Sequence, residues 1–451
     1  MKIKFKQLIE NSVILSLPGI ISIFISLLSI PIHLNYAGAE SYGNYIIFHF
    51  ILMISINFNF GIGKSTVVSI NNHPKKNEEI NFSALIYTKN ISVIIFTVFI
   101  LIFFLRETFF YNYTKYFNIV SYLFFGSIIT VFFITLEGIL QGNRKFEYIS
   151  FFNLSFFSLS ISVPSILLAY NYNLTLENLI LISVLIKFLS VLMMFFIIKK
   201  NNLVKKSKNK ILLNNLRKNS KWITLNSVLI QFYDLFDKYL IKFFLGPVAV
   251  ATYSIPQQLT GKLSIISKSF SAFLLPNLSK KKMDNQSLDF SLQIFMKIIP
   301  VIIFSIIPFY PSILEFWLGN SFNTTINNLT KIFSISVIFS CASHLLVTRF
   351  EATKSLNQNL KIEFFLMPFF LYSLYHLTSL NYSLILLSLL ILTKEVILFF
   401  LRLNILNQRV QKVNSYYLYS ILFLVMLYLS FFNIKFYFIF LLLLILNLFR
   451  K

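Results

Sequence analysis

The chain has 451 residues, of which 57% are hydrophobic and only 12% are charged, and its mean hydropathy is +0.74. Soluble domains carry about 25% charged residues, so this composition excludes a soluble globular protein and indicates a polytopic membrane protein. The formal net charge of +24 could favour nucleic acid. The cations lie in short segments between apolar runs, however, which argues against that partner. The single cysteine, Cys341, excludes an internal disulfide.

Apolar runs of spanning length, about 17–25 residues, recur along the whole chain. The first follows Lys2, Lys4 and Lys6, which resemble the start of a signal peptide. That run is too long and lacks a small-residue cleavage site, so we expect a retained helix. Backbone groups inside a bilayer need partners within their own segment, and the runs do not alternate, so we predict helices rather than barrel strands. The fourteen runs cover residues 12–34, 43–63, 84–105, 117–140, 148–170, 176–198, 222–245, 249–276, 291–310, 326–348, 362–379, 382–401, 417–433 and 436–449.

The predicted fold is an all-α polytopic transmembrane bundle of about 14 helices, with two pseudo-symmetric six-helix lobes plus two C-terminal helices. Residues 1–198 form the N-terminal lobe, 199–221 a basic cytoplasmic linker, 222–401 the C-terminal lobe and 402–451 the two additional helices. The linker holds nine cations and no acid. That composition suits a topology anchor or, alternatively, a contact with anionic lipid headgroups.

The distribution of lysine and arginine predicts the orientation. With the N-terminus inside, 28 of the 40 basic residues lie on the cytoplasmic side, with Arg349 and Arg402 counted as loop residues there, and 3 lie on the outer side. By the positive-inside rule, we expect a multi-pass plasma (inner) membrane protein with both termini cytoplasmic. Arg144 and Lys145, which follow the fourth span, should then face lipid headgroups on the cytoplasmic side.

The two predicted lobes echo each other in sequence. At an offset of 208 residues, five features align without a gap: Gly38 with Gly246, Tyr45 with Tyr253, Asn81-Phe-Ser83 with Asp289-Phe-Ser291, Lys89 with Lys297, and Val93-Ile-Ile-Phe96 with Val301-Ile-Ile-Phe304. An offset that spans an even number of helices predicts two parallel halves related by an axis along the membrane normal. Substrate is expected near the midplane, in a cleft between such halves.

Several lysines fall deep inside apolar runs. A charge at bilayer depth costs at least about 2.5–3.5 kcal/mol, which is hard to explain for a passive anchor. The cost is understandable if these side chains line a hydrated path and bind an anion, because lysine is a good point-charge partner for phosphate. The candidate substrate-binding residues are Lys187, Lys238, Lys262, Lys268 and Lys394.

Three acids in predicted spans are candidates for coupling to a proton or sodium ion. Asp234 and Lys238 are four residues apart and can pair, either to let the helix insert or as part of a cavity-lining face. Asp237 has no obvious partner on its own helix, so it is the first candidate. Glu395 follows Lys394 directly, and we expect adjacent side chains to point apart and to need separate partners.

Other residue types give weaker signals. The histidines, His33, His49, His73, His344 and His376, lack metal-ligand spacing, so we interpret them as interfacial or packed residues and expect no metal and no cofactor. Pro164, Pro256 and Pro300 each remove a backbone hydrogen bond and suit either hinges or static kinks. No Gly-rich phosphate loop with Lys and Ser/Thr, HExxH or GxSxG motif occurs, so we expect a protein that is not an enzyme.

Six stretches carry a resemblance to a known family. They are YAGAESYGNYI at 36–46, NFGIGKS at 59–65, LQGNRKF at 140–146, FYDLFDKYLIKFFLGPVAVATYSIPQ at 232–257, LPNLSKK at 275–281 and ILEFWLGNSFN at 313–323. In this order and spacing, the chain from about residue 11 to 410 resembles polysaccharide repeat-unit (O-antigen type) flippases of the multidrug/oligosaccharidyl-lipid/polysaccharide (MOP) exporter superfamily.

The resemblance implies two six-helix lobes, a central cavity lined by helices 1, 2, 7 and 8, and a lipid-linked pyrophosphoryl oligosaccharide that is moved outward. Family members often have arginine after the helix-7 aspartate, whereas this chain has Lys238, which keeps the charge but lacks the bidentate fork.

The expected function is therefore a flippase for undecaprenyl-pyrophosphate-linked repeat units in O-antigen or lipopolysaccharide biosynthesis, working by alternating access through a cationic central cavity. The expected partners are the lipid-linked oligosaccharide and membrane lipids, with a polysaccharide polymerase and a chain-length regulator as candidates, and no nucleic acid. One alternative is a cation-coupled multidrug exporter, against which the near absence of acids in the first six spans argues. The other is a non-transporting scaffold of a glycan-assembly complex, which would gain nothing from deep lysines.

Overall fold

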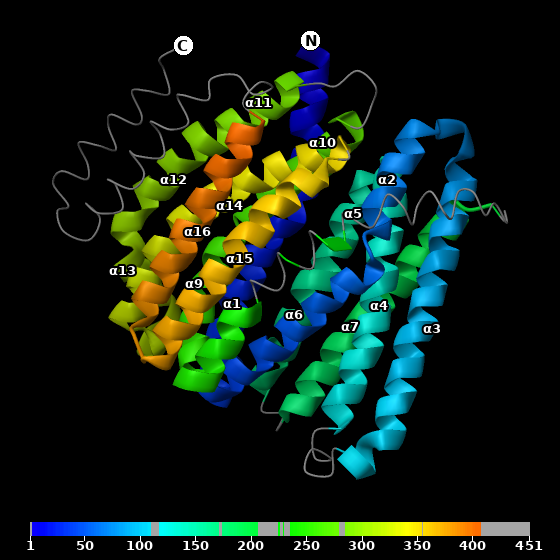
Figure 1. The fold of residues 1–451 in the computed structure, drawn as a ribbon. Helices are drawn as coiled ribbons and strands as arrows, with labels where there is room; N and C mark the ends of the chain where they lie inside the picture. Colours follow the sequence, from blue (N-terminus) through cyan, green and yellow to red (C-terminus); the bar gives the residue numbers. More distant parts are fainter. Residues whose placement is uncertain are drawn as a thin grey trace. The chain divides into compact units, whose positions relative to one another are not determined.

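The chain is helical throughout the part that the structure describes. The computed structural model describes residues 2–109, 117–170, 174–205, 224–225, 229, 235–278, 285–353 and 355–406 (Figure 1). Within these residues no strand occurs, which confirms the predicted all-α class. The two predicted C-terminal spans, most of the basic linker and much of the seventh span lie outside the described residues, so the count of fourteen stays a prediction.

The N-terminal half follows the predicted runs closely. In chain order its elements are α1 (Lys2–Ile54), η1 (Ser55–Asn59), α2 (Ile62–Asn72), η2 (Pro74–Lys76), α3 (Asn77–Phe109), α4 (Phe117–Gly142), α5 (Phe146–Asn153), the π-helical η4 (Leu154–Leu159), α6 (Ser160–Leu167), η5 (Leu168–Tyr170) and α7 (Leu176–Lys200). The elements from α5 to η5 form one continuous span, Phe146–Tyr170, which matches the predicted fifth run.

The C-terminal half begins with helical residues 235–245. Its further elements are α9 (Pro247–Gly261), α10 (Ser264–Leu278), α11 (Asn285–Gln293), the π-helical η6 (Ile294–Ile298), α12 (Ile299–Ile306), η7 (Ile307–Phe309), α13 (Tyr310–Leu318), η8 (Gly319–Ser321), α14 (Thr324–Ala352), α15 (Leu356–Ser379) and α16 (Leu384–Ile405). The predicted eighth span is two helices, because the chain turns at Lys262 and Leu263.

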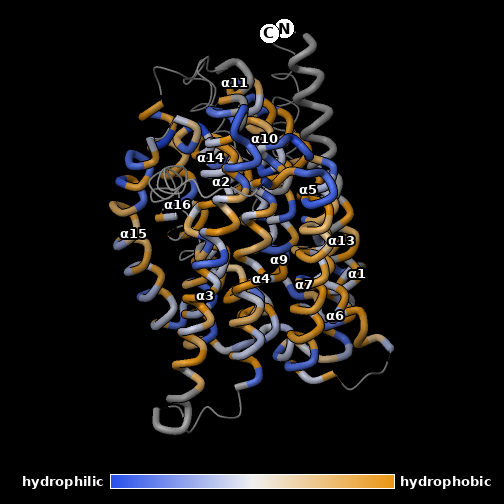
Figure 2. Tube along the Cα trace, turned by 90° about the vertical axis from the view of Figure 1, so that its right-hand side faces the viewer, coloured by the Kyte–Doolittle hydropathy of each residue, from blue (hydrophilic) through white to orange (hydrophobic). Residues whose placement is uncertain are grey.

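Seven helical segments within the described residues are long and apolar enough to cross a membrane. Figure 2 shows hydrophobic residues, in orange, along most of α3, α4 and α7. A lipid-facing surface explains why large apolar side chains such as Ile94 of α3 and Phe196 of α7 stay exposed. The chain is therefore a multi-pass membrane protein.

Contacts between helices divide the chain into two units, which we call the first unit (Ile14–Tyr239) and the second unit (Met1–Val13 with Leu240–Lys451). In the first unit α4 packs against α2, α3 and α7. In the second unit α14 packs against α9, α10 and α16. The fourth predicted span and the tenth, six spans later, thus have the same central place, as a duplicated architecture requires.

The paired glycines of the repeat share an unusual backbone conformation. Gly38 interrupts α1 with φ 79° and ψ 167°, and Gly246 precedes α9 with φ 85° and ψ 172°. This region is essentially restricted to glycine. Tyr45 and Tyr253, which follow each glycine by seven residues, are both fully buried. These matches support the internal repeat that the sequence predicts.

The backbones of α2 and α4 touch in the first unit. A Cβ on Gly63 would lie 2.5 Å from the backbone oxygen of Ile134, and one on Gly138 would meet the backbone of Gly63. Asn59 reinforces the contact, because its side-chain amide donates to the Thr135 hydroxyl at 2.6 Å and its oxygen accepts from the Gly63 amide at 2.9 Å. Only glycine permits this approach.

Two of the three prolines that the sequence singled out lie beside irregular turns, where a missing amide hydrogen is tolerated. Pro164 in α6 follows the π-helical η4, and Pro300 in α12 follows the π-helical η6. Pro256 lies inside α9, six residues before the turn at Lys262.

Candidate functional site

A line of buried rings runs along α1 of the first unit and meets α6 and α7. The centroids of His33 and Tyr45 lie 5.2 Å apart, and those of Tyr45 and His49 lie 4.6 Å apart. The Tyr45 hydroxyl lies 3.1 Å from Ser183 Oγ, and His49 Nε2 lies 3.4 Å from the same oxygen. His33 Nδ1 lies 3.0 Å from Ser165 Oγ. The interpretation of these two histidines as packed residues is confirmed, but their shared network was not predicted.

Lys187 is enclosed within the first unit. Its side chain is on α7, the residue is only 1% exposed, and its ammonium lies 4.2 Å above the Phe156 ring and 5.9 Å from the Phe157 ring. Both rings belong to η4, whose wide π-helical turn presents two consecutive phenylalanines to one cation. Such cation–π contacts favour a desolvated charge by about 2 kcal/mol. In the described part of the chain, no carboxylate forms an ion pair with this lysine.

Asp237 and Lys238 form a buried ion pair in the first unit, where the two residues are each 1% exposed. Lys238 Nζ lies 3.1 Å from Asp237 Oδ1 and 4.0 Å from the Phe50 ring centroid on α1. The expectation that Asp237 lacks a partner on its own helix is wrong. The long lysine stem folds back to the adjacent carboxylate, which is less costly than burying the two charges apart. Asp234, the other expected partner of Lys238, lies outside the described residues.

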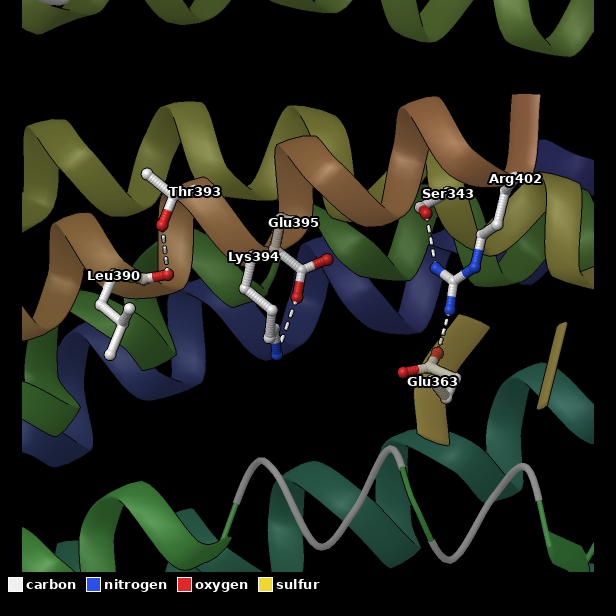
Figure 3. A network of polar contacts seen from close by, with 7 residues as sticks. All are labelled: Ser343, Glu363, Leu390, Thr393, Lys394, Glu395 and Arg402. Atoms are coloured by element: carbon white, nitrogen blue, oxygen red, sulfur yellow. Dashed lines mark hydrogen bonds and ion pairs between the residues drawn. The ribbon is translucent and has the colours of Figure 1, made fainter. Parts of the chain in front are cut away.

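Lys394 and Glu395 also pair with each other, on α16 of the second unit (Figure 3). The Lys394 ammonium lies 3.0 Å from Glu395 Oε1, and it lies 5.1 Å from the ring centroid of Phe370 on α15. The expectation that these adjacent side chains point apart is therefore wrong. Their side chains are 10% and 15% exposed, so the pair is only partly desolvated.

Arg402 ties three helices of the second unit together. Its Nε donates to Asn359 Oδ1 at 2.7 Å, its Nη1 donates to Ser343 Oγ at 2.5 Å, and its Nη2 pairs with Glu363 Oε1. Figure 3 shows Arg402 on α16 with Glu363 approaching from α15 and Ser343 from α14. Nε, Nη1 and Nη2 of Arg402 thus each meet a partner inside an apolar bundle, as a buried guanidinium requires.

The assignment of Arg349 and Arg402 to cytoplasmic loops is wrong. Arg349 lies in α14 and is 2% exposed, and Arg402 lies in α16 and is 4% exposed. Both helices continue beyond the apolar runs from which their ends were predicted. Sequence spacing carried no signal for Arg402, because its partners lie on α14 and α15.

The remaining candidates are less enclosed. Lys262 is half-buried at the end of α9, and Lys268 is exposed on α10. Arg144 and Lys145 are exposed in the turn between α4 and α5, where Arg144 has a positive φ of 58°. Their roles toward substrate and headgroups remain proposals. Among the described residues, no three His, Cys, Asp or Glu side chains converge as metal ligands.

Comparisons with known proteins agree with this architecture. The family model described as "Polysaccharide biosynthesis protein" matches residues 8–282. A putative O-antigen transporter of Shigella flexneri is 26% identical over 145 residues, which cover 31% of this chain and 33% of that relative. The matched region thus spans a third of the relative's length.

Solved structures show the same fold over almost the whole chain. A MATE in complex with MaL6 superposes with a TM-score of 0.69 at 14% identity, over 90% of this chain and 97% of the other. The lipid II flippase MurJ, in an inward closed conformation, superposes with a TM-score of 0.64 at 16% identity, over 97% and 99%. A MOP superfamily transporter from Pyrococcus furiosus reaches 0.65 at 14% identity, over 88% and 94%.

At these identities, the structural matches establish a shared fold alone. The family model covers more than half of the chain and agrees with the predicted resemblance. The chain therefore belongs to the Polysaccharide biosynthesis protein family and has the helical fold of MOP superfamily transporters.

Proposed function

We propose that the protein is a flippase that moves undecaprenyl-pyrophosphate-linked oligosaccharide repeat units from the cytoplasmic to the outer leaflet, by alternating access along a cationic path. The observation that carries this proposal is the polysaccharide biosynthesis family match over residues 8–282. The fold shared with a lipid II flippase adds support, because that protein also handles a lipid-linked saccharide by its name.

The charges of the described spans suit an anionic headgroup. Lys262, at the end of α9, and Lys268, on α10, place two cations in the second unit. A pyrophosphate group would be attracted to cations in such a low-dielectric environment far more strongly than in water. A cationic drug would be repelled by the same residues.

The proposed location is the plasma (inner) membrane with cytoplasmic termini. In this orientation Arg144 and Lys145 face the leaflet in which the lipid-linked unit is assembled. A polymerase that joins repeat units and a chain-length regulator would act on the product at the outer face, so they are the proposed protein partners.

Complementation tests the proposal directly. The protein is expressed in a strain that lacks its own repeat-unit flippase, and surface glycan is measured together with the lipid-linked units accumulated at the cytoplasmic face. We expect restored surface glycan and loss of the accumulated intermediate. A strain that gains only resistance to cationic drugs would favour the multidrug exporter instead.

Two substitutions then test the cationic path. The variant with both Lys262→Ala and Lys268→Ala should restore at least about tenfold less surface glycan at equal protein abundance, because each lost phosphate contact removes about 1–2 kcal/mol. Normal surface glycan at normal abundance would remove these two lysines from the path.

A further inference from the structure

The hydrogen bonds around the rings of α1 indicate which nitrogen of the buried His49 carries its proton. The Ser183 hydroxyl donates its single proton to the backbone oxygen of Leu179 at 2.9 Å. With that proton directed to Leu179, Ser183 Oγ accepts from His49 Nε2 at 3.4 Å, and we assign the His49 proton to Nε2 on this basis. His49 Nδ1 is left as a bare acceptor, and it is buried without a hydrogen-bond partner in the described residues.

Lys187 lies at the same interface, and its ammonium has no hydrogen-bond acceptor among the described residues. Ser183 and Lys187 are four residues apart on α7, so they share one helix face, and Ser183 is the residue that contacts His49. Described residues offer the Lys187 ammonium only the faces of Phe156 and Phe157. The interface therefore holds a buried base without a donor beside a buried ammonium without an acceptor.

The charged and titratable groups around this interface can be named for each element that packs there. α1 contributes His33, Tyr42 and Tyr45, which approach one another as rings. The helical residues 235–245 contribute Asp237 and Lys238, which neutralise each other and approach α1 at Phe50. On α6 and η4 the groups near the rings and Lys187 are neutral, namely the Ser165 hydroxyl and the Phe156 and Phe157 rings. α4, which packs against α7, contributes the acid Glu137, whose Oε1 accepts a hydrogen bond from the Asn153 side-chain amide at 3.0 Å.

Two buried bases at one interface cannot both be charged at low cost, because desolvation and like-charge repulsion add. The favoured state of the His49–Lys187 pair is therefore the one in which only one of the two side chains is charged. The Tyr45 and His49 ring centroids lie 4.6 Å apart, and the Lys187 ammonium lies 4.2 Å from the Phe156 ring centroid. A single proton can bind to such a site without displacing these side chains.

We infer that His49 and Lys187 form a proton-binding site of the first unit that is coupled to transport. Uptake forms one N–H bond at His49 Nδ1 or at Lys187 Nζ, and release breaks that bond and returns the proton to water. The inference rests on the proposed function and names its driving ion. It replaces Asp237 and Glu395 as the proton carriers, because each of these acids has a lysine beside it.

The first experiment measures proton binding without cargo. Purified protein in lipid nanodiscs is titrated between about pH 8 and about pH 5. The number of protons bound per molecule is compared between the wild type and its variants. The variant with both His49→Gln and Lys187→Met should bind about one proton fewer than the wild type, with altered steps, because the coupled pair is gone. His376→Gln, which removes an exposed histidine of α15, is the control and should leave the titration steps of the His49–Lys187 pair unchanged.

The second experiment measures coupling. Vesicles that contain the protein and a fluorescent lipid-linked saccharide are given a pH gradient, and the rate of flipping is followed. Lys187→Arg keeps the positive charge but cannot release a proton in this range. We expect this variant to keep downhill flipping and to lose the gradient response by about tenfold or more, whereas His376→Gln responds like the wild type.

A Lys187→Arg protein that responds to the gradient like the wild type would overturn the inference, as would a double variant that binds as many protons as the wild type. If the double variant does not fold, Lys187→Arg must still show the proton deficit, because the arginine keeps its charge throughout the range and repels a second charge on His49. Failure of the wild type to flip the saccharide would instead contradict the proposed function and leave the cargo-free titration valid.

Discussion

Lys187 in the first unit and Lys394 in the second unit are both enclosed lysines, but they differ in their carboxylate neighbours. Lys187 lies on α7 with its ammonium 4.2 Å from the Phe156 ring, and Lys394 lies on α16 with its ammonium 5.1 Å from the Phe370 ring. Of the two, only Lys394 forms an ion pair within the described residues, with Glu395 at 3.0 Å. The two units thus bury a lysine in different ways, and the charge without an ion-pair partner in the described residues is in the first unit.

The difference extends to how each unit is held together. The first unit brings α2 and α4 together through Gly63 and Gly138, with backbone in contact. The second unit has Ser271 and Leu346 at the positions 208 residues later, and it joins its helices through the Arg402 network instead. Duplicated halves have therefore stabilised one arrangement by different means.

The largest effect is expected in the second unit. Arg402→Met removes the guanidinium from Glu363 and leaves a carboxylate buried, which should lower the free energy of unfolding by about 3–5 kcal/mol. Thermal unfolding in detergent measures the loss. Adding Glu363→Gln should restore part of the lost free energy of unfolding. An Arg402→Met protein as stable as the wild type would contradict the conclusion that the Arg402–Glu363 pair holds the second unit together.

The next effect concerns the first unit. Gly138→Ala places a methyl group against the backbone of Gly63, where no flexible side chain can move aside, and should cost about 3 kcal/mol through overpacking. Gly261→Ala is the matched control, because its Cβ would meet nothing within 4 Å. If the two substitutions lower the melting temperature equally, close backbone contact does not distinguish the first unit.

A substitution shared by both units should have equal effects. Gly38→Ala and Gly246→Ala meet no steric obstacle, but both place alanine at a positive φ near 80°. Each should cost about 2 kcal/mol of backbone strain. Melting curves of the two variants provide the comparison, and a large difference between them would show that the repeated geometry is not equally required.

The smallest effect on stability is expected for Glu395→Gln, which tests the comparison between Lys394 and Lys187. Glu395→Gln removes the carboxylate beside Lys394 and makes the second unit resemble the first. Because the pair is partly exposed, stability should change by no more than about 1 kcal/mol. Thermal unfolding of this variant beside the wild type measures the change. A loss as large as that of Arg402→Met would mean that the pair is far more buried than its geometry indicates.

Sequence patterns predicted the helices well because each apolar run must satisfy its backbone within itself. They predicted helix ends less well, since α14 and α16 continue past their apolar runs and carry Arg349 and Arg402 inside. The depth of Lys187 followed from its run, but its neighbour Phe156 and the nearby His49 did not, because partners on other helices depend on packing. The Asp237–Lys238 and Lys394–Glu395 pairs escaped prediction because helix periodicity separates adjacent residues, whereas a lysine stem is long enough to bend back.

The glycine contact between α2 and α4 also limits how the first unit can move. Helices that meet backbone to backbone, and that are pinned by Asn59 and Thr135, have no intervening side chains to re-pack, so they resist sliding. Any conformational cycle should carry the pair as one rigid block. Spin labels on the two helices should keep a constant separation in every state, even while distances to other labelled sites change.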